Sequence, residues 1–138
     1  MRRIVFVSSL VFLLSLAGSA QSIENASHST IGYIHSNGTV ENSSHSTIGY
    51  IQSNGPIENS SHSTMGYLKS DGTVENASHS TIGRIRSNGT VENSSNSTIG
   101  RIKDDGAVEN SSYSTIGYAR EVKREAAAIF FFFFFKPQ

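Results

Sequence analysis

Histidine recurs at one phase of the sequence, and it is the residue type best suited to binding a metal ion. The residues are His28, His45, His62 and His79, spaced 17 residues apart. In a ring of units these imidazoles would offer nitrogen ligands to Zn²⁺ or a similar ion. A symmetric ring would hold them too far apart to share one ion, and Asn96 and Tyr113 occupy the phase in the last two units. We therefore expect polar turn residues here, with no metal site and no cofactor.

Glutamate is equally periodic, and paired carboxylates carry out glycoside hydrolysis. The residues are Glu24, Glu41, Glu58, Glu75, Glu92 and Glu109. A glycosidase needs one carboxyl group with a raised pKa and one with an ordinary pKa, so the two must have unlike surroundings. Identical repeats give equivalent surroundings, and no Ser/His/Asp set or nucleophile elbow stands out. The pattern favours structural hydrogen bonds, and we expect that the protein is not an enzyme.

Aromatic residues form a third periodic set, at the position after each repeated glycine. Tyr33, Tyr50, Tyr67 and Tyr118 occupy it in four units, and Arg84 and Arg101 occupy it in two. Because an arginine is rarely buried without a partner, this position is expected to face solvent. A surface row of tyrosines suits general contact with a partner, or stacking on sugar rings. The candidate ligand face is therefore Tyr33, Tyr50 and Tyr67, with a glycan as one candidate partner.

The units that position these side chains are a 17-residue repeat. The phrase apolar-Glu-Asn-small-Ser-x-Ser-Thr-apolar-Gly begins at Ile23, Val40, Ile57, Val74, Val91 and Val108. Five Asn-Gly or Asp-Gly pairs separate the phrases, at 37–38, 54–55, 71–72, 88–89 and 105–106. These pairs supply the positive φ angles of type I′ hairpin turns, and the polar run inside each phrase is a second reversal. Two short strands per unit follow, since no window keeps the apolar period of a helix.

Each unit has three apolar positions, such as Val40, Ile48 and Ile51. Ile48 and Ile51 are three residues apart, so a regular strand would point them to opposite faces. A bulge or bend at Gly49 would bring both to one face, and a strand buried on both sides is the alternative. Because three small side chains cannot stabilise a lone unit, the strict phasing favours units packed on one another over a disordered Ser/Asn/Gly-rich tract.

The first twenty residues have the pattern of a secretory signal peptide. Arg2 and Arg3 precede an apolar stretch from Ile4 to Leu16, and small residues follow at 17–20. We expect cleavage after Ala20, which leaves one β-repeat domain over 21–138, with repeats at about 23–118 and a tail over 119–138. A membrane anchor is the alternative, although the stretch is shorter than the roughly 20 residues a bilayer needs. The prediction is an exported protein, periplasmic or extracellular, with no transmembrane span in the mature chain.

Composition narrows the classes of partner. The chain has no cysteine, so disulfides and thiolate metal sites are excluded. It has 11 basic and 11 acidic residues, and losing Arg2 and Arg3 leaves the mature chain slightly acidic. No large basic field attracts nucleic acid, which is therefore not an expected partner.

The tail departs from the repeat. A charged stretch over 119–125 leads to small apolar residues at 126–129 and then to six consecutive phenylalanines, Phe130 to Phe135. This run is too short to span a bilayer as a helix, and it would promote aggregation if it were exposed. We expect a closing strand whose rings fill the space that the small repeat residues leave vacant. The alternative is an interface through Phe130 to Phe135 with another copy of the chain or with a membrane surface.

The chain repeats the phrase Ser-Thr-Ile-Gly-Tyr-Ile … Asn-Gly-Thr-Val-Glu-Asn-Ser-Ser and ends with Ala-Ala and a phenylalanine run. This combination resembles the five-fold β-flower family, small exported proteins of Bacteroidetes-type bacteria. The resemblance covers roughly residues 23–135. It implies β-hairpin petals closed around a pseudo-five-fold axis, with the sixth phrase completing the last petal or closing the ring. An open β-solenoid is the alternative. The stretch 122–125 departs from the family pattern, which has an aromatic residue before the alanines. The departure affects the expected docking of the tail and not the expected fold.

The resemblance implies no known activity. The prediction for function is therefore an exported structural or interaction module of the envelope or cell exterior, without catalytic activity. The alternative is a multivalent carbohydrate-binding protein that uses the tyrosine face.

Overall fold

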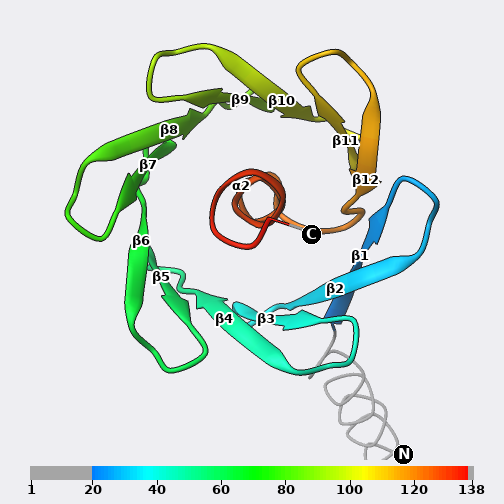
Figure 1. Ribbon diagram of the computed structural model, residues 1–138, viewed down its shortest axis with the longest axis horizontal. Coiled ribbons are helices and arrows are strands. Elements are labelled where there is room, and N and C mark those ends of the chain that lie inside the picture. Colours follow the sequence, from blue (N-terminus) through cyan, green and yellow to red (C-terminus); the bar gives the residue numbers. More distant parts are fainter. Residues whose placement is uncertain (1–19, 137–138) are drawn as a thin grey trace, which may run out of the picture.

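The computed structural model describes residues 20–136, and in it twelve strands form one closed antiparallel ring (Figure 1). The strands are β1 (Ala20–Asn25), β2 (Thr30–His35), β3 (Thr39–Asn42), β4 (Thr47–Ile51), β5 (Pro56–Asn59), β6 (Thr64–Leu68), β7 (Thr73–Asn76), β8 (Thr81–Ile85), β9 (Thr90–Asn93), β10 (Thr98–Ile102), β11 (Ala107–Asn110) and β12 (Thr115–Tyr118). Each strand pairs with its neighbours in the chain, and β1 pairs with β12. The predicted all-β repeats and closed arrangement are confirmed, in preference to an open solenoid. The predicted signal peptide lies outside the described residues, apart from Ala20.

The ring contains six hairpins, one for each phrase of the sequence, where five petals were expected. Five Asn/Asp-Gly turns suffice for six hairpins because the last joint of a closed ring needs no covalent connection. At that joint β1 and β12 are held by strand pairing, with Glu24 opposite Tyr118 and Asn25 opposite Gly117. The number of phrases, and not the number of turns, therefore equals the number of petals.

The polar run of each phrase forms the outer turn of a hairpin, between its two strands. In the second hairpin, Asn42 Oδ1 accepts hydrogen bonds from the backbone N–H groups of Ser44 and Ser46, at 2.9 and 3.0 Å. His45 between them has a φ of 67°. Histidine is among the residues that adopt this left-handed conformation most readily. The repeated Asn and His thus suit the turn, although Asn96 and Tyr113 adopt the same conformation at the histidine position.

The Asn-Gly pairs form the inner turns, which connect one hairpin to the next. Gly38 N donates to His35 O at 2.9 Å, and Gly38 has a φ of 95°. A type I′ turn would need a positive φ at both central residues, Ser36 and Asn37, and neither has one. The predicted reversal is confirmed, but the predicted turn type is wrong. The glycine serves as the last residue of the turn, and Asn37 Oδ1 accepts a hydrogen bond from Thr39 N at 3.0 Å.

The irregularity predicted at the repeated glycine is confirmed. Val40 pairs with Gly49 and Glu41 pairs with Thr47, so Ile48 is the extra residue of a bulge. The same shift occurs in all six hairpins. Gly49 does not have a positive φ, so the physical reason for this glycine is space. A Cβ atom there would lie 2.6 Å from a ring carbon of Phe135.

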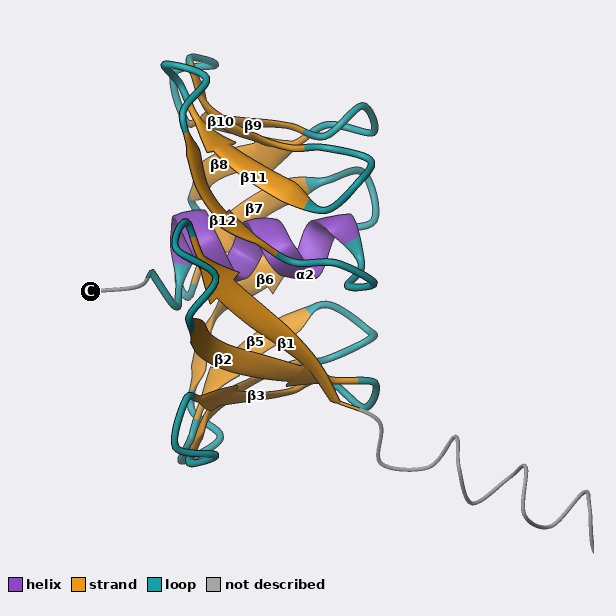
Figure 2. Cartoon of the chain, turned by 90° about the vertical axis from the view of Figure 1, so that its right-hand side faces the viewer, coloured by secondary structure: helices purple, strands orange, loops and turns teal. Residues whose placement is uncertain are grey.

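The tail is a helix in the centre of the ring, and the predicted closing strand is wrong (Figures 1 and 2). Helix α2 (Arg124–Ala128) continues into the π-helix η1 (Ile129–Phe133). The pairing of β1 with β12 already closes the ring, so a further strand would have no backbone partners there. A helix bonds its own N–H and C=O groups, which suits an apolar interior, and its alanines have the highest helix propensity.

The six phenylalanines lie over the six repeated glycines, one for each hairpin. The pairs are Phe130 with Gly32, Phe131 with Gly117, Phe132 with Gly100, Phe133 with Gly83, Phe134 with Gly66, and Phe135 with Gly49. An α-helix turns every 3.6 residues and would direct Phe130 and Phe134 to nearly the same hairpin. The wider π-helical turn, with Phe134 N bonded to Ile129 O at 3.2 Å, spreads consecutive rings around the axis.

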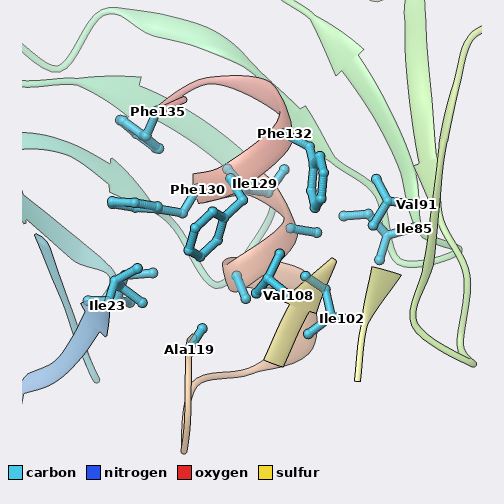
Figure 3. Close-up of a cluster of buried hydrophobic side chains, with 14 of the residues drawn as sticks. Ile23, Ile85, Val91, Ile102, Val108, Ala119, Ile129, Phe130, Phe132 and Phe135 are labelled. Carbon is cyan, nitrogen blue, oxygen red and sulfur yellow. The ribbon is translucent and has the colours of Figure 1, made fainter. Parts of the chain in front are cut away.

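The core is therefore shared between the ring and the tail. Figure 3 shows Phe130 and Phe132 in one cluster with Ile23 and Val91 of the strands. The rings fill the central space, as predicted, although from a helix. Phe130 is only 2% exposed. The run is largely occupied inside its own chain, which leaves little of it for the alternative interface with another copy or a membrane.

Candidate functional site

The most regular polar cluster joins a tyrosine of one hairpin to the outer turn of the next. Tyr33 on β2 stacks on His45, with ring centroids 4.2 Å apart and planes at 16°. His45 Nδ1 in turn lies 3.0 Å from Glu41 Oε1. Glu41 is on β3 and His45 follows it in the turn, so the repeat itself brings the three side chains together. We call this arrangement of tyrosine, histidine and glutamate an outer unit.

Four outer units have the same composition. They are Tyr33–His45–Glu41, Tyr50–His62–Glu58, Tyr67–His79–Glu75 and Tyr118–His28–Glu24. The last one crosses the joint between β12 and β1, where Arg120 also contacts Glu24 at 3.4 Å. In a fifth position the guanidinium of Arg101 lies 3.8 Å above the ring of Tyr113. A side chain therefore still stacks on its neighbour at this position, although both residues differ from the tyrosine and histidine of the outer units.

The glutamate of each outer unit is contacted from two sides. His45 meets one carboxylate oxygen of Glu41, and His35 Nε2 lies 3.0 Å from the other. The hydrogen bond from His45, and next the neighbouring His35, hold the pKa of Glu41 below its ordinary value of 4.5. His28 lowers the pKa of Glu24 in the same way, and His62 lowers that of Glu58. These carboxylates are therefore stabilised as anions, which is the opposite of what a general acid needs.

Glu92 is the exception among the repeated glutamates. Its Oε2 accepts a hydrogen bond from Arg86 Nε at 2.9 Å. Its Oε1 is buried and has no hydrogen-bond partner among residues 20–136. The cause is the substitution of histidine by Asn96, whose shorter side chain makes no bond to the carboxylate. The residue is 8% exposed, so this oxygen has lost water without gaining a partner.

The candidate face of Tyr33, Tyr50 and Tyr67 lies at equivalent places on β2, β4 and β6, in three adjacent hairpins. A histidine ring covers one face of each tyrosine. In the sequence the tyrosines and the histidines form two separate periodic sets. Their constant offset of twelve residues, kept where Arg101 meets Tyr113, was the signal that they form pairs.

The histidines do not converge on one point. In the part of the chain that the structure describes, no group of three or more His, Asp or Glu side chains is placed to hold a metal ion. Each of the four stacked imidazoles instead has its own tyrosine and lies beside a different glutamate. The chemistry available to an outer unit is hydrogen bonding and stacking.

Each hairpin corresponds to one sequence repeat, and the hairpins close into a ring around a C-terminal helix. This fold defines a class of β-repeat protein whose repeats share one central core. Residues 20–135 match the family model of the 5-fold beta-flower proteins, so the chain belongs to this family, although its own ring has six hairpins. Curated proteins and solved structures gave no match. The resemblance seen in the sequence is thereby confirmed. None of the helices within residues 20–136 is long and apolar enough to cross a membrane.

Proposed function

We propose that this β-flower protein is an exported, non-catalytic interaction module that binds a repetitive partner through its outer units. The observation that carries the proposal is the presence of four copies of one Tyr–His–Glu arrangement around a closed ring. When several equal sites meet a partner that repeats, each further contact is intramolecular, so weak individual contacts give strong overall binding. A closed ring keeps the spacing of the sites fixed.

The absence of catalytic activity is part of the proposal and is supported by the equivalence of the units. Glu24, Glu41 and Glu58 have the same kind of partner, and all have a lowered pKa. A hydrolase that uses two carboxyl groups needs one of them to be protonated at working pH. Because the repeats give these glutamates similar surroundings, such a difference in pKa between two of them is not expected.

Export is proposed from the sequence pattern of residues 1–20 and needs its own test. We expect the mature chain to begin at Gln21. Mass spectrometry of the protein from periplasmic and extracellular fractions of the native host measures this directly. Recovery of only the full chain, starting at Met1 and held in membranes, would favour the anchor alternative.

A glycan polymer is the partner that suits these units best. Sugar rings stack on aromatic faces, and the stacked histidine rings are largely exposed, with His45 and His62 at 62% and His79 at 64% of the side chain. The stacks of Tyr33, Tyr50 and Tyr67 have nearly the same geometry in adjacent hairpins and would present three such faces in a row. Hydroxyl groups of the sugar could bond the histidine edge, which is exposed.

The decisive experiment measures binding to purified cell-envelope polysaccharide as units are removed one at a time. Variants His45→Asn, His45→Asn/His62→Asn and the change of all four stacked histidines should lower the affinity stepwise, each by a similar factor. His35→Asn is the matched control, because it removes a histidine that contacts Glu41 without stacking on a tyrosine. Equal binding by the wild type and the fourfold variant would refute the proposal, and so would absence of binding by the wild type at millimolar sugar.

A further inference from the structure

A cavity of about 750 Å³ lies at the inner-turn end of the ring, between the first three inner turns and the start of the tail. We call it the groove. Its floor is Ile34, Ile51 and Leu68, and the tail contributes Val122 and Ala126. The volume falls in the range of small-molecule sites. The rest of the lining is polar apart from two glycines. The groove lies away from the stacked histidines, whose turns are at the other ends of the strands.

The repeat provides an internal comparison that shows why the groove exists. The floor position is occupied around the ring by Ile34, Ile51, Leu68, Ile85, Ile102 and Ala119. Ile34, Ile85 and Ile102 are 7%, 4% and 3% exposed, whereas Ile51 and Leu68 are only partly buried. The floor position is thus covered in the first, fourth and fifth hairpins and left accessible in the second and third.

Arg124 accounts for this asymmetry. Its guanidinium donates to the carbonyl oxygen of Ser87 and to the carboxylate of Asp104. Both acceptors are in inner turns of the later hairpins, so the contacts tie the start of α2 to that side. The second and third hairpins are left with an accessible apolar floor, Ile51 and Leu68. Arg124 belongs to the stretch that departs from the family pattern, and it determines how the tail docks.

The middle turn of the groove carries a free side-chain amide. In the other four inner turns the Asn or Asp side chain accepts a hydrogen bond from the backbone N–H two residues on, at 3.0 Å. Asn54 makes no such bond within the described chain, because the residue two positions on is Pro56, which has no N–H. Its amide lines the groove and can both donate and accept.

The charges around the groove balance. Lys69 and Lys123 line it together with Glu121 and Glu125. Lys69 also lies 3.8 Å from Glu75, and His35 lies 3.0 Å from Glu41. A lining of this kind produces no field that would concentrate an anion or a cation. Its remaining polar groups are amides and the hydroxyls of Ser36, Ser53 and Ser70.

We propose that the groove binds an uncharged small molecule that has an aliphatic body and hydroxyl or amide groups along one edge. The body lies on Ile51 and Leu68, and the polar edge bonds the amide of Asn54. This function is additional to that of the outer units and does not depend on them.

The probe for the test is n-octyl β-D-glucoside below its micelle concentration, followed by backbone amide chemical shifts of the mature protein. We expect the shifts of the first three inner turns and of the start of α2 to move together. Glucose lacks the aliphatic body, and octanoate carries a charge that the balanced lining does not compensate. Each should bind at least about tenfold more weakly, because glucose buries no aliphatic chain and the carboxylate of octanoate loses water without gaining a charged partner.

Two variants locate the site. Ser53→Trp fills the groove and should abolish binding. Ser61→Trp, the same change at the other end of β5 in an exposed outer turn, should leave binding unchanged. Asn54→Ala should weaken it about two- to tenfold, the value of one hydrogen bond. Amide spectra of each variant show whether the ring is intact.

The outcomes separate this proposal from the preceding one. His45→Asn disrupts an outer unit and should not change binding of the glucoside. Equal effects of Ser53→Trp and Ser61→Trp would overturn the groove proposal. So would equal binding of octanoate, or chemical shifts that move only at the outer turns.

Discussion

The inside and the outside of the ring use the same repeat in opposite ways. Inside, one tail supplies six consecutive phenylalanines, the first four in η1 and the last two directly after it, and each meets the equivalent glycine of a different hairpin. Outside, each unit carries its own tyrosine, histidine and glutamate. An interior change therefore disturbs a core that all hairpins share, whereas an exterior change stays within one unit. We expect the largest effects on stability inside.

The largest expected effect is that of Phe130→Ala. Phe130 is almost fully buried, so the change removes a large apolar contact and leaves a cavity in the shared core. The expected loss is about 3–5 kcal/mol in the free energy of unfolding, measured by urea denaturation of the mature protein. Phe134→Ala is the matched control, because this ring is only partly buried and should cost distinctly less. Equal losses would mean that the rings are not arranged around the axis as described.

A change on the glycine side of the same kind of contact should have the next largest effect. In Gly49→Ala the new methyl group meets both the carbonyl oxygen of Glu58 and the ring of Phe135, so we expect a loss of about 1–3 kcal/mol from overpacking. In the double variant with Phe135→Leu, the smaller side chain relieves the collision with the ring, while the collision with the backbone of Glu58 remains. A double-mutant cycle in urea should then show a favourable coupling that recovers part of the loss. Strict additivity would mean that the ring of Phe135 does not limit the space at this glycine.

Much of this interior was predictable from the sequence. The constant spacing of glycine and of apolar residues predicted the hairpins, the two reversals and the bulge beside Gly49, because each depends on residues close together in the chain. The helical tail was not predictable in the same way. A run of identical phenylalanines has no periodicity, and only the closed ring, which leaves no strand edge inside, decides in favour of a helix.

The exterior was predicted only in part. The tyrosines, histidines and glutamates were each recognised as periodic, but their contacts join different hairpins, and that depends on how neighbouring units pack. The groove was missed for a similar reason. The groove forms because Arg124 attaches the tail to one side of the ring. The repeat sequence is nearly the same in every hairpin, so it does not indicate which side that is.

Outside the ring, one defect of the repeat can be repaired. Asn96→His restores the residue found in four other units and gives the buried Oε1 of Glu92 a partner. The expected gain is about 1 kcal/mol in the free energy of unfolding, and histidine also tolerates the φ of 66° found at this position. Asn96→Ala is the control and should lose stability, since alanine tolerates that φ poorly. A histidine variant no more stable than the wild type would contradict this account of Glu92.

The smallest expected effect concerns acid stability. Contacts with His45 and His35 lower the pKa of Glu41 in the folded state, and those with His28 and His62 do the same for Glu24 and Glu58. A lowered pKa means that the stabilisation is complete above the unfolded value, near 4.5, and is lost as the pH falls through the folded value. Thermal melting between pH 7 and pH 2 should therefore show a decline that begins below about pH 5. Glu41→Gln cannot titrate at this position, so its decline should be shallower by the contribution of one glutamate. Gln52→Ala removes the second of the two hydrogen bonds that lower the pKa of Glu58, so its decline should be shallower by a smaller amount. If Glu41→Gln followed the wild-type curve in parallel, the outer units would contribute nothing to the pH dependence, and their contacts would serve only to shape the surface.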